Sequence, residues 1–196
     1  FNTNYDRTKT WTTSLNYSYS FTTKPVTPFK KVKFMRKSKW WAIIRDMNFY
    51  LTPKNVAFSS DVMRNYNERQ IRNNIVPDYE FAPVYIKQFN WNRTYYLAWD
   101  LTKKLKFSFD ANNRSMFQEG DGAVDKEDAI GYQSFKDTIR DQLRTFGSAM
   151  DYSHNYTFKY TLPLDKIPAT NWMSANITWK GSYNWQRGPL AQPEYG

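Results

Sequence analysis

The stretch Arg45–Asn73, RDMNFYLTPKNVAFSSDVMRNYNERQIRN, decides the fold class of this chain. Proline fixes φ and has no N–H to donate to a sheet, so Pro53 predicts a tight turn over Thr52–Asn55. We interpret Asn48–Leu51 as the end of one strand and Val56–Tyr66 as the next strand. Along Val56–Tyr66, mainly apolar residues alternate with mainly polar ones, which is the period of a two-faced strand. The stretch therefore predicts a β-hairpin with one apolar and one polar face.

The same period of two recurs along the chain and predicts about eight antiparallel strands in four hairpins. The expected strands are Phe1–Asp6, Trp11–Phe21, Asn48–Leu51, Val56–Tyr66, Gln88–Leu101, Leu105–Asn112, Tyr152–Leu162 and Met173–Gln186. Short turns are expected near Arg7, Pro53, Lys103 and Asp165, and long loops between the hairpins. Short turns at one end and long loops at the other are typical of a transmembrane β-barrel of the outer membrane.

The longest connection, residues 114–148, is expected to be a loop that contains one helix. Apolar residues recur there at helical spacing, and a glycine follows them as a plausible C-cap. These residues are Tyr132, Phe135, Ile139, Leu143 and Phe146, followed by Gly147. We expect the apolar stripe to pack against the rest of the protein.

The composition supports a barrel wall more than a soluble core. Aromatic residues make up 19% of the 196 residues, yet the mean hydropathy is −0.80 and the net charge is +10. Aromatic side chains carry the apolar role, and Ser, Thr and Asn fill the positions between them. No run of eighteen apolar residues is present, which excludes a transmembrane helix but not a transmembrane strand. Because the chain opens on Phe1, we interpret residues 1–196 as part of one outer-membrane β-barrel domain of a longer chain.

No group of residues predicts catalysis, a cofactor or a metal centre, so we expect a protein that is not an enzyme. The single histidine, His154, lies within a strand pattern, and the absence of cysteine removes thiolate ligands. The basic cluster Lys30–Lys39 is interpreted as a solvated loop, with no nucleic-acid partner. An acidic loop leaves calcium binding as a minor hypothesis, although it lacks the EF-hand order. Its carboxylates are Glu119, Asp121, Asp125, Glu127 and Asp128.

Three blocks carry a resemblance to a known family. They are DMNFYLTPKNVAFSSDVMRNYNERQIRNN (Asp46–Asn74), FNWNRTYYLAWDLTKKLKFSFDANN (Phe89–Asn113) and LPLDKIPATNWMSANITWKGSYNWQRGPL (Leu162–Leu190). In order and spacing they resemble the SprA/Sov family, the outer-membrane translocons of the type IX secretion system of Bacteroidota, which were first linked to gliding motility. The family-like hairpin residues are Asn48, Pro53, Arg64, Asn67 and Arg72.

The resemblance implies a role in protein secretion at the bacterial outer membrane. Members form a very large single-chain barrel that conducts folded proteins with a C-terminal signal domain, together with a PorV-type shuttle barrel and a periplasmic plug protein. On this interpretation the helix lies in a loop that caps or narrows the lumen, and one set of polar side chains faces the water-filled lumen. That set is Asn92, Thr94, Asn155, Thr157, Asn176, Thr178 and Asn184.

Tryptophans near the expected strand ends fit the aromatic girdles that lie at the two interfaces of a membrane. They are Trp11, Trp91, Trp99, Trp172 and Trp185. The other face of the strands would then meet outer-membrane lipid or neighbouring elements of the barrel wall.

Three alternatives remain open from the sequence. A porin or TonB-dependent transporter would share every barrel feature. A soluble β-sandwich could bind glycans through its aromatic residues. A complete eight-stranded barrel could act as a membrane hydrolase, although no catalytic set supports that interpretation.

Overall fold

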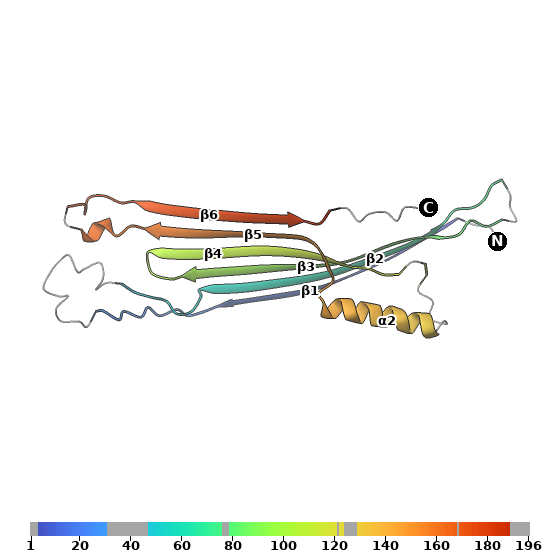
Figure 1. Cartoon of the computed structure of the whole chain (residues 1–196), viewed down its shortest axis with the longest axis horizontal. Helices are drawn as coiled ribbons and strands as arrows, with labels where there is room; N and C mark the ends of the chain where they lie inside the picture. The colour runs from blue at the N-terminus through green and yellow to red at the C-terminus, as the bar shows by residue number, and fades with distance from the viewer. Residues whose placement is uncertain are drawn as a thin grey trace.

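A computed structural model of the chain describes residues 4–30, 47–75, 79–120, 122–123, 129–167 and 169–188. Within them six strands form one open antiparallel sheet in which each strand pairs with its neighbours in sequence, so β1 and β6 are the edges (Figure 1). The elements are β1 (Tyr5–Ser20), β2 (Asn55–Gln70), β3 (Val84–Asp100), β4 (Leu105–Phe117), α2 (Ala129–Arg144), β5 (Ser148–Thr161), the 3-10 turn η3 (Leu164–Lys166) and β6 (Asn176–Gln186). The all-β prediction is confirmed, whereas the expected eight strands are six in the described part of the chain.

The register of the sheet sorts its side chains into two continuous faces. Residues paired across antiparallel strands point to the same side, so each face can be followed from β1 to β6. One face holds the odd-numbered residues of β1, β3, β4 and β6 and the even-numbered residues of β2 and of β5 from Tyr152 onward. We call this the aromatic face, and we call the opposite one the polar face. A bulge opposite Arg114 and Ser115 shifts the alternation once, at the start of β5.

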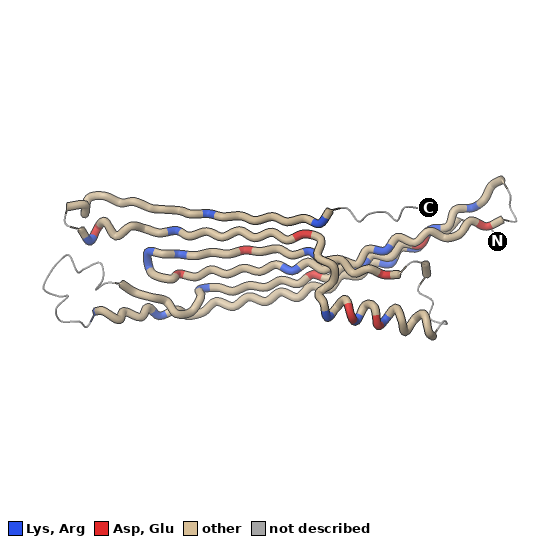
Figure 2. Tube along the Cα trace, viewed as in Figure 1, with Lys and Arg blue, Asp and Glu red and all other residues tan. Residues whose placement is uncertain are grey.

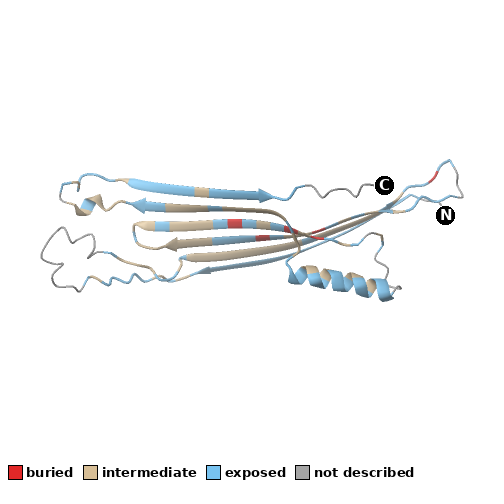
Figure 3. Cartoon of the chain, viewed as in Figure 1, coloured by how far each residue is buried: buried red, intermediate tan, exposed pale blue. Residues whose placement is uncertain are grey.

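The sheet is a single layer with almost no interior. Among the described residues, the buried apolar side chains are Phe89, Ala111 and Phe117 (Figure 3). A soluble domain of this length would cover one face of its sheet with a second layer. Here both faces are accessible over most of their area, and large aromatic side chains are exposed on one of them.

The turn expected near Arg7 is wrong, because β1 runs without interruption from Tyr5 to Ser20. Arg7 pairs with Glu68 and Thr10 with Asn65 in the same ladder as the rest of the strand. The segment RTKT contains no Gly, Pro or Asn, and its threonines favour a strand, so nothing in it supplies the geometry of a turn.

The hairpin corner expected at Pro53 is also wrong. Val26 and Phe49 form an antiparallel bridge, so the chain reverses between them, and past Pro53 it continues in the same direction into β2. Asn48–Leu51 is not a strand, although the N–H of Tyr50 donates to the carbonyl of Leu101 at 3.1 Å. Since proline cannot donate to a ladder, Pro53 interrupts the β1–β2 ribbon instead of ending it.

The tight turn between β3 and β4 is confirmed. Thr102 closes it, because its Oγ1 accepts from the N–H groups of Lys104 and Leu105 at 3.1 and 2.8 Å. The long connection 21–54 lies at the same end of the sheet as this turn, so the expected separation of short turns from long loops is wrong. The connection expected over 114–148 is shorter, residues 118–147, because β4 extends to Phe117.

The helix is confirmed, and its expected packing is confirmed in part. No residue of α2 is buried and Leu143 is exposed, whereas Tyr132, Phe135 and Ile139 are half-buried and Phe146, 55% exposed, stacks on Trp91 of the sheet. Its C-terminal cap also differs, because the left-handed residue is Phe146, with φ of 62°, followed by Gly147 with φ of 71°. The N–H of Gly147 donates to the carbonyl of Gln142 at 2.7 Å, as in a Schellman motif. Within the described residues, no helix is long and apolar enough to cross a membrane.

Candidate functional site

The aromatic face carries a band of apolar side chains across all six strands. Tyr17, Phe58 and Tyr95 occupy one row of paired residues, and Phe107, Phe158 and Trp179 contribute to another. Phe107 and Phe158 lie 4.6 Å apart between ring centroids, and Phe158 stacks on Trp179 at 5.6 Å. The part of this face between the paired residues at Leu105 and Tyr160 and the paired residues at Tyr95 and Ala111 holds no Lys, Arg, Asp or Glu. The charged side chains of this face all lie nearer the start of β1. They are Arg7, Lys9, Arg64, Glu68, Lys87 and Arg93. Figure 2 marks the basic and acidic residues of both faces along the trace.

The polar face is built from Ser, Thr and Asn with balanced charge. Across the six strands it carries five basic and five acidic side chains, Arg69, Lys106, Arg114, Lys159 and Lys180 against Asp6, Asp61, Asp100, Asp110 and Asp151. Ser59 donates to Asn16 Oδ1 at 2.7 Å, and Asn155 donates to Asp110 Oδ2 at 2.8 Å across neighbouring strands. The excess of positive charge in the whole chain therefore lies elsewhere.

The residues expected to face a lumen are brought together on the polar face. Asn92 and Thr94 lie on β3, Asn155 and Thr157 on β5, and Asn176, Thr178 and Asn184 on β6. All seven side chains lie on one face of the sheet. This follows from the register, because residues paired between neighbouring strands from β3 to β6 point to the same side.

Four of the five expected girdle tryptophans lie on the aromatic face, namely Trp11, Trp91, Trp99 and Trp185. Trp172 does not, because β6 begins at Asn176 and Trp172 lies in the preceding connection, 80% exposed. Trp179 belongs to the aromatic face and was missed as a girdle residue. Its position within the strand alternation was the signal that could have found it.

A cluster around Arg93 anchors the β4–β5 connection on the aromatic face. The Arg93 guanidinium lies against both stacked rings, Trp91 and Phe146, at 4.7 and 5.1 Å from their centroids. Its Nη2 donates to Asn113 Oδ1 at 2.8 Å and to Ser115 Oγ at 2.7 Å. Arg93 is 8% exposed. The stacked rings of Trp91 and Phe146 account for the left-handed conformation of Phe146, which an L-residue rarely adopts without compensation.

A second anchor holds the beginning of the same connection. Arg64 donates to Glu119 in a two-bonded ion pair, with Nη2 to Oε2 at 2.7 Å, and the Glu119 side chain is 1% exposed. Lys87 Nζ donates to the carbonyl of Gly120 on the same side of the sheet. The connection therefore crosses the aromatic face, and the expectation that its helix caps a lumen lined by the polar face is not supported by these contacts.

The Arg64 ion pair also bears on the calcium hypothesis. Glu119 directs both carboxylate oxygens to Arg64, which leaves it poorly placed as a calcium ligand. The other four carboxylates, Asp121, Asp125, Glu127 and Asp128, lie outside the described residues. Within the described residues no three His, Asp or Glu side chains are grouped as a metal centre.

The family-like hairpin residues do not form one site. Asn48 Oδ1 accepts from the N–H of Lys103 at 2.7 Å at one end of the sheet. Arg72 N–H donates to Asn4 Oδ1 at the other end. Between them Arg64 points to the aromatic face and Asn67 to the polar face, where Asn67 donates to Asp6 and Thr8.

His154 lies in the strand position expected from the sequence. It stacks on Tyr183 at 5.4 Å and lies close to Tyr152 and Phe109 on the aromatic face. Its surroundings are aromatic rings, with no carboxylate or hydroxyl nucleophile among its ring contacts. This position gives His154 a packing role.

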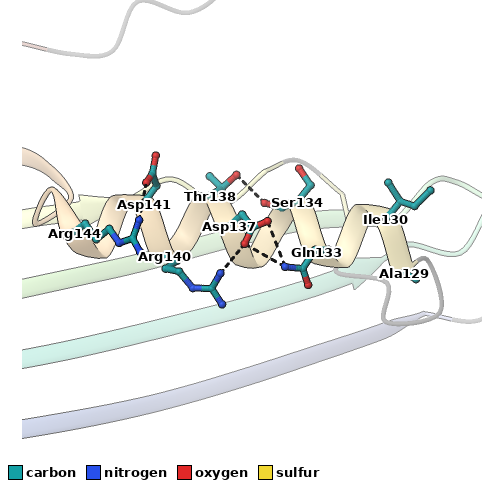
Figure 4. A pocket seen from close by; sticks show the side chains of 9 residues that line it. All are labelled: Ala129, Ile130, Gln133, Ser134, Asp137, Thr138, Arg140, Asp141 and Arg144. Carbon is teal, nitrogen blue, oxygen red and sulfur yellow. Dashed lines mark hydrogen bonds and ion pairs between the residues drawn. The ribbon is translucent and has the colours of Figure 1, made fainter.

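The exposed side of α2 carries a shallow hollow of about 900 Å³, and its described lining residues all belong to the helix (Figure 4). Asp137 binds Gln133 and Arg140 there, and Arg144 lies 4.0 Å from Asp141. These are pairs between neighbouring turns of one solvated helix, which contribute a few tenths of a kcal/mol each. Among its described lining residues, no groups converge on a common point where a ligand could bind.

Comparison with protein-family models finds no match for this chain, and comparison with curated proteins finds none that matches. The candidate functional site is therefore defined by geometry: a single sheet with an aromatic face and a charge-balanced polar face.

Proposed function

We propose that this chain is a wall segment of an outer-membrane β-barrel, the translocon that conducts folded proteins with a C-terminal signal domain in type IX secretion. The observation that carries the proposal is the segregation of aromatic and polar side chains across all six strands of an uncovered single layer. An apolar surface of this extent is stable only against lipid or another protein. The polar face would line water, and the role would be conduction without catalysis.

The spacing of two tryptophans approaches the thickness of a bilayer. Trp91 and Trp99 are eight residues apart on β3, about 26 Å along the strand at about 3.3 Å per residue. A strand tilt of about 40° reduces this to about 20 Å across the membrane, less than the apolar band of about 25 Å seen on such barrels. Arg93 lies on the same face inside this interval, against Phe146, so the Trp91 end would lie at the headgroups. Strands of 11 to 17 residues exceed the roughly ten that a span needs, so β1 to β3 would extend beyond the membrane.

The polar face suits passage of folded cargo. Balanced charge over Ser, Thr and Asn gives a hydrated surface without strong selection for either sign of charge. At the start of β3 the same face carries exposed apolar side chains, Val84 and Ile86 with Ile71 and Phe81 beside them, so the hydrated surface is the remainder of the face. The open edges of β1 and β6 would pair with further strands of a larger barrel, since isolated edges promote aggregation. A PorV-type shuttle and a periplasmic plug protein are the partners proposed with this role.

Cross-linking of arrested cargo tests the function. Asn155→Cys and Tyr156→Cys, made in a cysteine-free form of the secretion-competent protein, place single thiols on neighbouring residues of opposite faces; residues 1–196 themselves contain no cysteine. With a bifunctional thiol reagent, cargo stalled during export should cross-link from Asn155→Cys and not from Tyr156→Cys. Equal cross-linking from both, or none from either while secretion proceeds, would contradict the proposal.

The alternatives differ in what covers the aromatic face. A soluble glycan-binding sandwich would need a second sheet, and the described residues form one layer. A porin or TonB-dependent transporter would share the two-faced wall but would not export folded protein, so the cargo cross-link separates it from the proposed translocon.

A further inference from the structure

A pocket of about 740 Å³ lies at the end of the sheet that carries the β3–β4 turn. Three connections line it: the segments 27–30 and 47–49 between β1 and β2, the turn 102–104, and the segment 163–166 around η3. Trp99 Nε1 donates to the carbonyl of Tyr50 at 2.8 Å, which holds the β1–β2 connection against the aromatic face. The pocket is therefore built from parts of the chain far apart in sequence.

The described lining of this pocket is strongly basic. It contains Lys30, Lys103, Lys104 and Lys166 against one carboxylate, Asp165. The hydrogen bond from Lys104 holds the pKa of Asp165 below its usual range, so the carboxylate is charged at neutral pH and offsets one lysine. Lysine ammonium groups bind phosphate as point charges, and the surplus of positive charge favours an anionic ligand.

The same pocket is apolar on the side that meets the sheet. Leu105 and Tyr160 line it, and both belong to the outermost paired row of the aromatic face, next to Trp99 and Phe107. A ligand that fills the pocket and continues along the sheet thus meets ammonium groups first and aromatic rings second. Lysines at such a boundary keep their heads in water while their stems cover apolar surface.

We propose that this pocket binds the phosphate headgroup of an anionic membrane lipid, whose acyl chains lie along the aromatic face. The proposal rests on the proposed function, because it requires lipid at that face. The proposed function requires only that lipid of any kind covers the aromatic face, and the pocket adds a site that selects an anionic headgroup. A free phosphate ion would use the lysines but not the apolar row, so the two ligands can be separated by experiment.

The test is lipid binding to the full-length protein in zwitterionic phosphatidylcholine nanodiscs, measured by native mass spectrometry during titration with phosphatidylglycerol. The double variant Lys30→Gln and Lys103→Gln removes two exposed lining lysines that lie outside the Lys104–Asp165 pair. A matched control, Lys159→Gln and Lys180→Gln, removes the same charge from the polar face. We expect phosphatidylglycerol binding to weaken about tenfold or more in the first variant and less than twofold in the control.

The outcomes separate the two proposals. Insertion into nanodiscs with no preference for phosphatidylglycerol, or equal loss in both variants, overturns the lipid site alone. If glycerophosphate without acyl chains binds as tightly as the lipid, the site is one for free phosphate and the lipid assignment is wrong. Failure of the wild-type protein to enter zwitterionic nanodiscs would instead contradict the membrane-wall function.

Discussion

Replacing Arg93 with methionine should release the β4–β5 connection from the sheet. The Arg93 side chain contacts the rings of Trp91 and Phe146 and donates a hydrogen bond to Ser115, which is 1% exposed. Methionine keeps most of the apolar stem beside the two stacked rings but removes the charge and the N–H donors. The perturbation therefore tests the anchor with little change in packing volume.

The expected magnitude follows from the contacts of Arg93. The bonds to Asn113 and Ser115 stay within the sheet, so only the contacts to Phe146 hold the connection. The ring contact and the long hydrogen bond from Nη2 to the Phe146 carbonyl, 3.5 Å, contribute about 1 kcal/mol each, and burial of the guanidinium with Nε unbonded offsets about half of this sum. The net loss is about 1 kcal/mol of local opening free energy, which corresponds to an opening equilibrium constant about fivefold larger.

Hydrogen exchange read by mass spectrometry on the protein in nanodiscs measures this opening. The amide of Gly147, which donates to the carbonyl of Gln142, should exchange about fivefold faster in the variant. Arg114→Met is the matched control, because Arg114 is half exposed and pairs with Asp151 on the polar face. Unchanged exchange around Gly147 in Arg93→Met, or an equal increase in the control, would refute the anchor.

Three further predictions follow from the two faces. Gly181→Ala would place a Cβ 2.2 Å from Cζ of Tyr156, so the tyrosine ring would have to turn away. We expect the free energy of unfolding in urea to fall by about 1 to 2 kcal/mol, and an unchanged unfolding midpoint would contradict the close approach. Tyr156→Lys, nearer the middle of the apolar band, should destabilise the folded protein in lipid by about 2 to 4 kcal/mol, whereas its neighbour Thr157→Lys on the polar face should cost under about 1 kcal/mol. Equal costs would argue against a lipid-facing aromatic side. Trp172→Ala should leave unfolding within about 0.5 kcal/mol, because the side chain is 80% exposed in a connection, and a larger loss would show a contact missing from this account.

The strands from β2 to β6 could be predicted because their alternation of aromatic with Ser, Thr and Asn is local and long. Runs such as Tyr152–Thr161 have no other regular conformation that places one residue type on one side. The two faces followed from the same pattern, although the register that joins them across six strands needed the structure.

The predictions that were wrong concern segments in which the local sequence pattern was weak or pointed to a different structure. Arg7–Thr10 carries polar residues that suggested a turn, but its pairing with β2 favours a strand. Pro53 indicated a corner, whereas it only interrupts a ribbon that continues to the Val26–Phe49 bridge. The Arg93–Phe146 anchor joins residues more than fifty positions apart, so no local periodicity could reveal it.

The most direct test of the membrane wall is the accessibility of spin labels along β6 in a bilayer. Single cysteines at Thr178, Trp179, Lys180 and Tyr183 carry the label, and collision rates are measured with oxygen, which enters lipid, and with a water-soluble nickel chelate. The account predicts that Trp179 and Tyr183 collide mainly with oxygen, and Thr178 and Lys180 mainly with nickel. Equal nickel accessibility at all four sites would contradict the proposal that the aromatic face meets lipid while the polar face lines water.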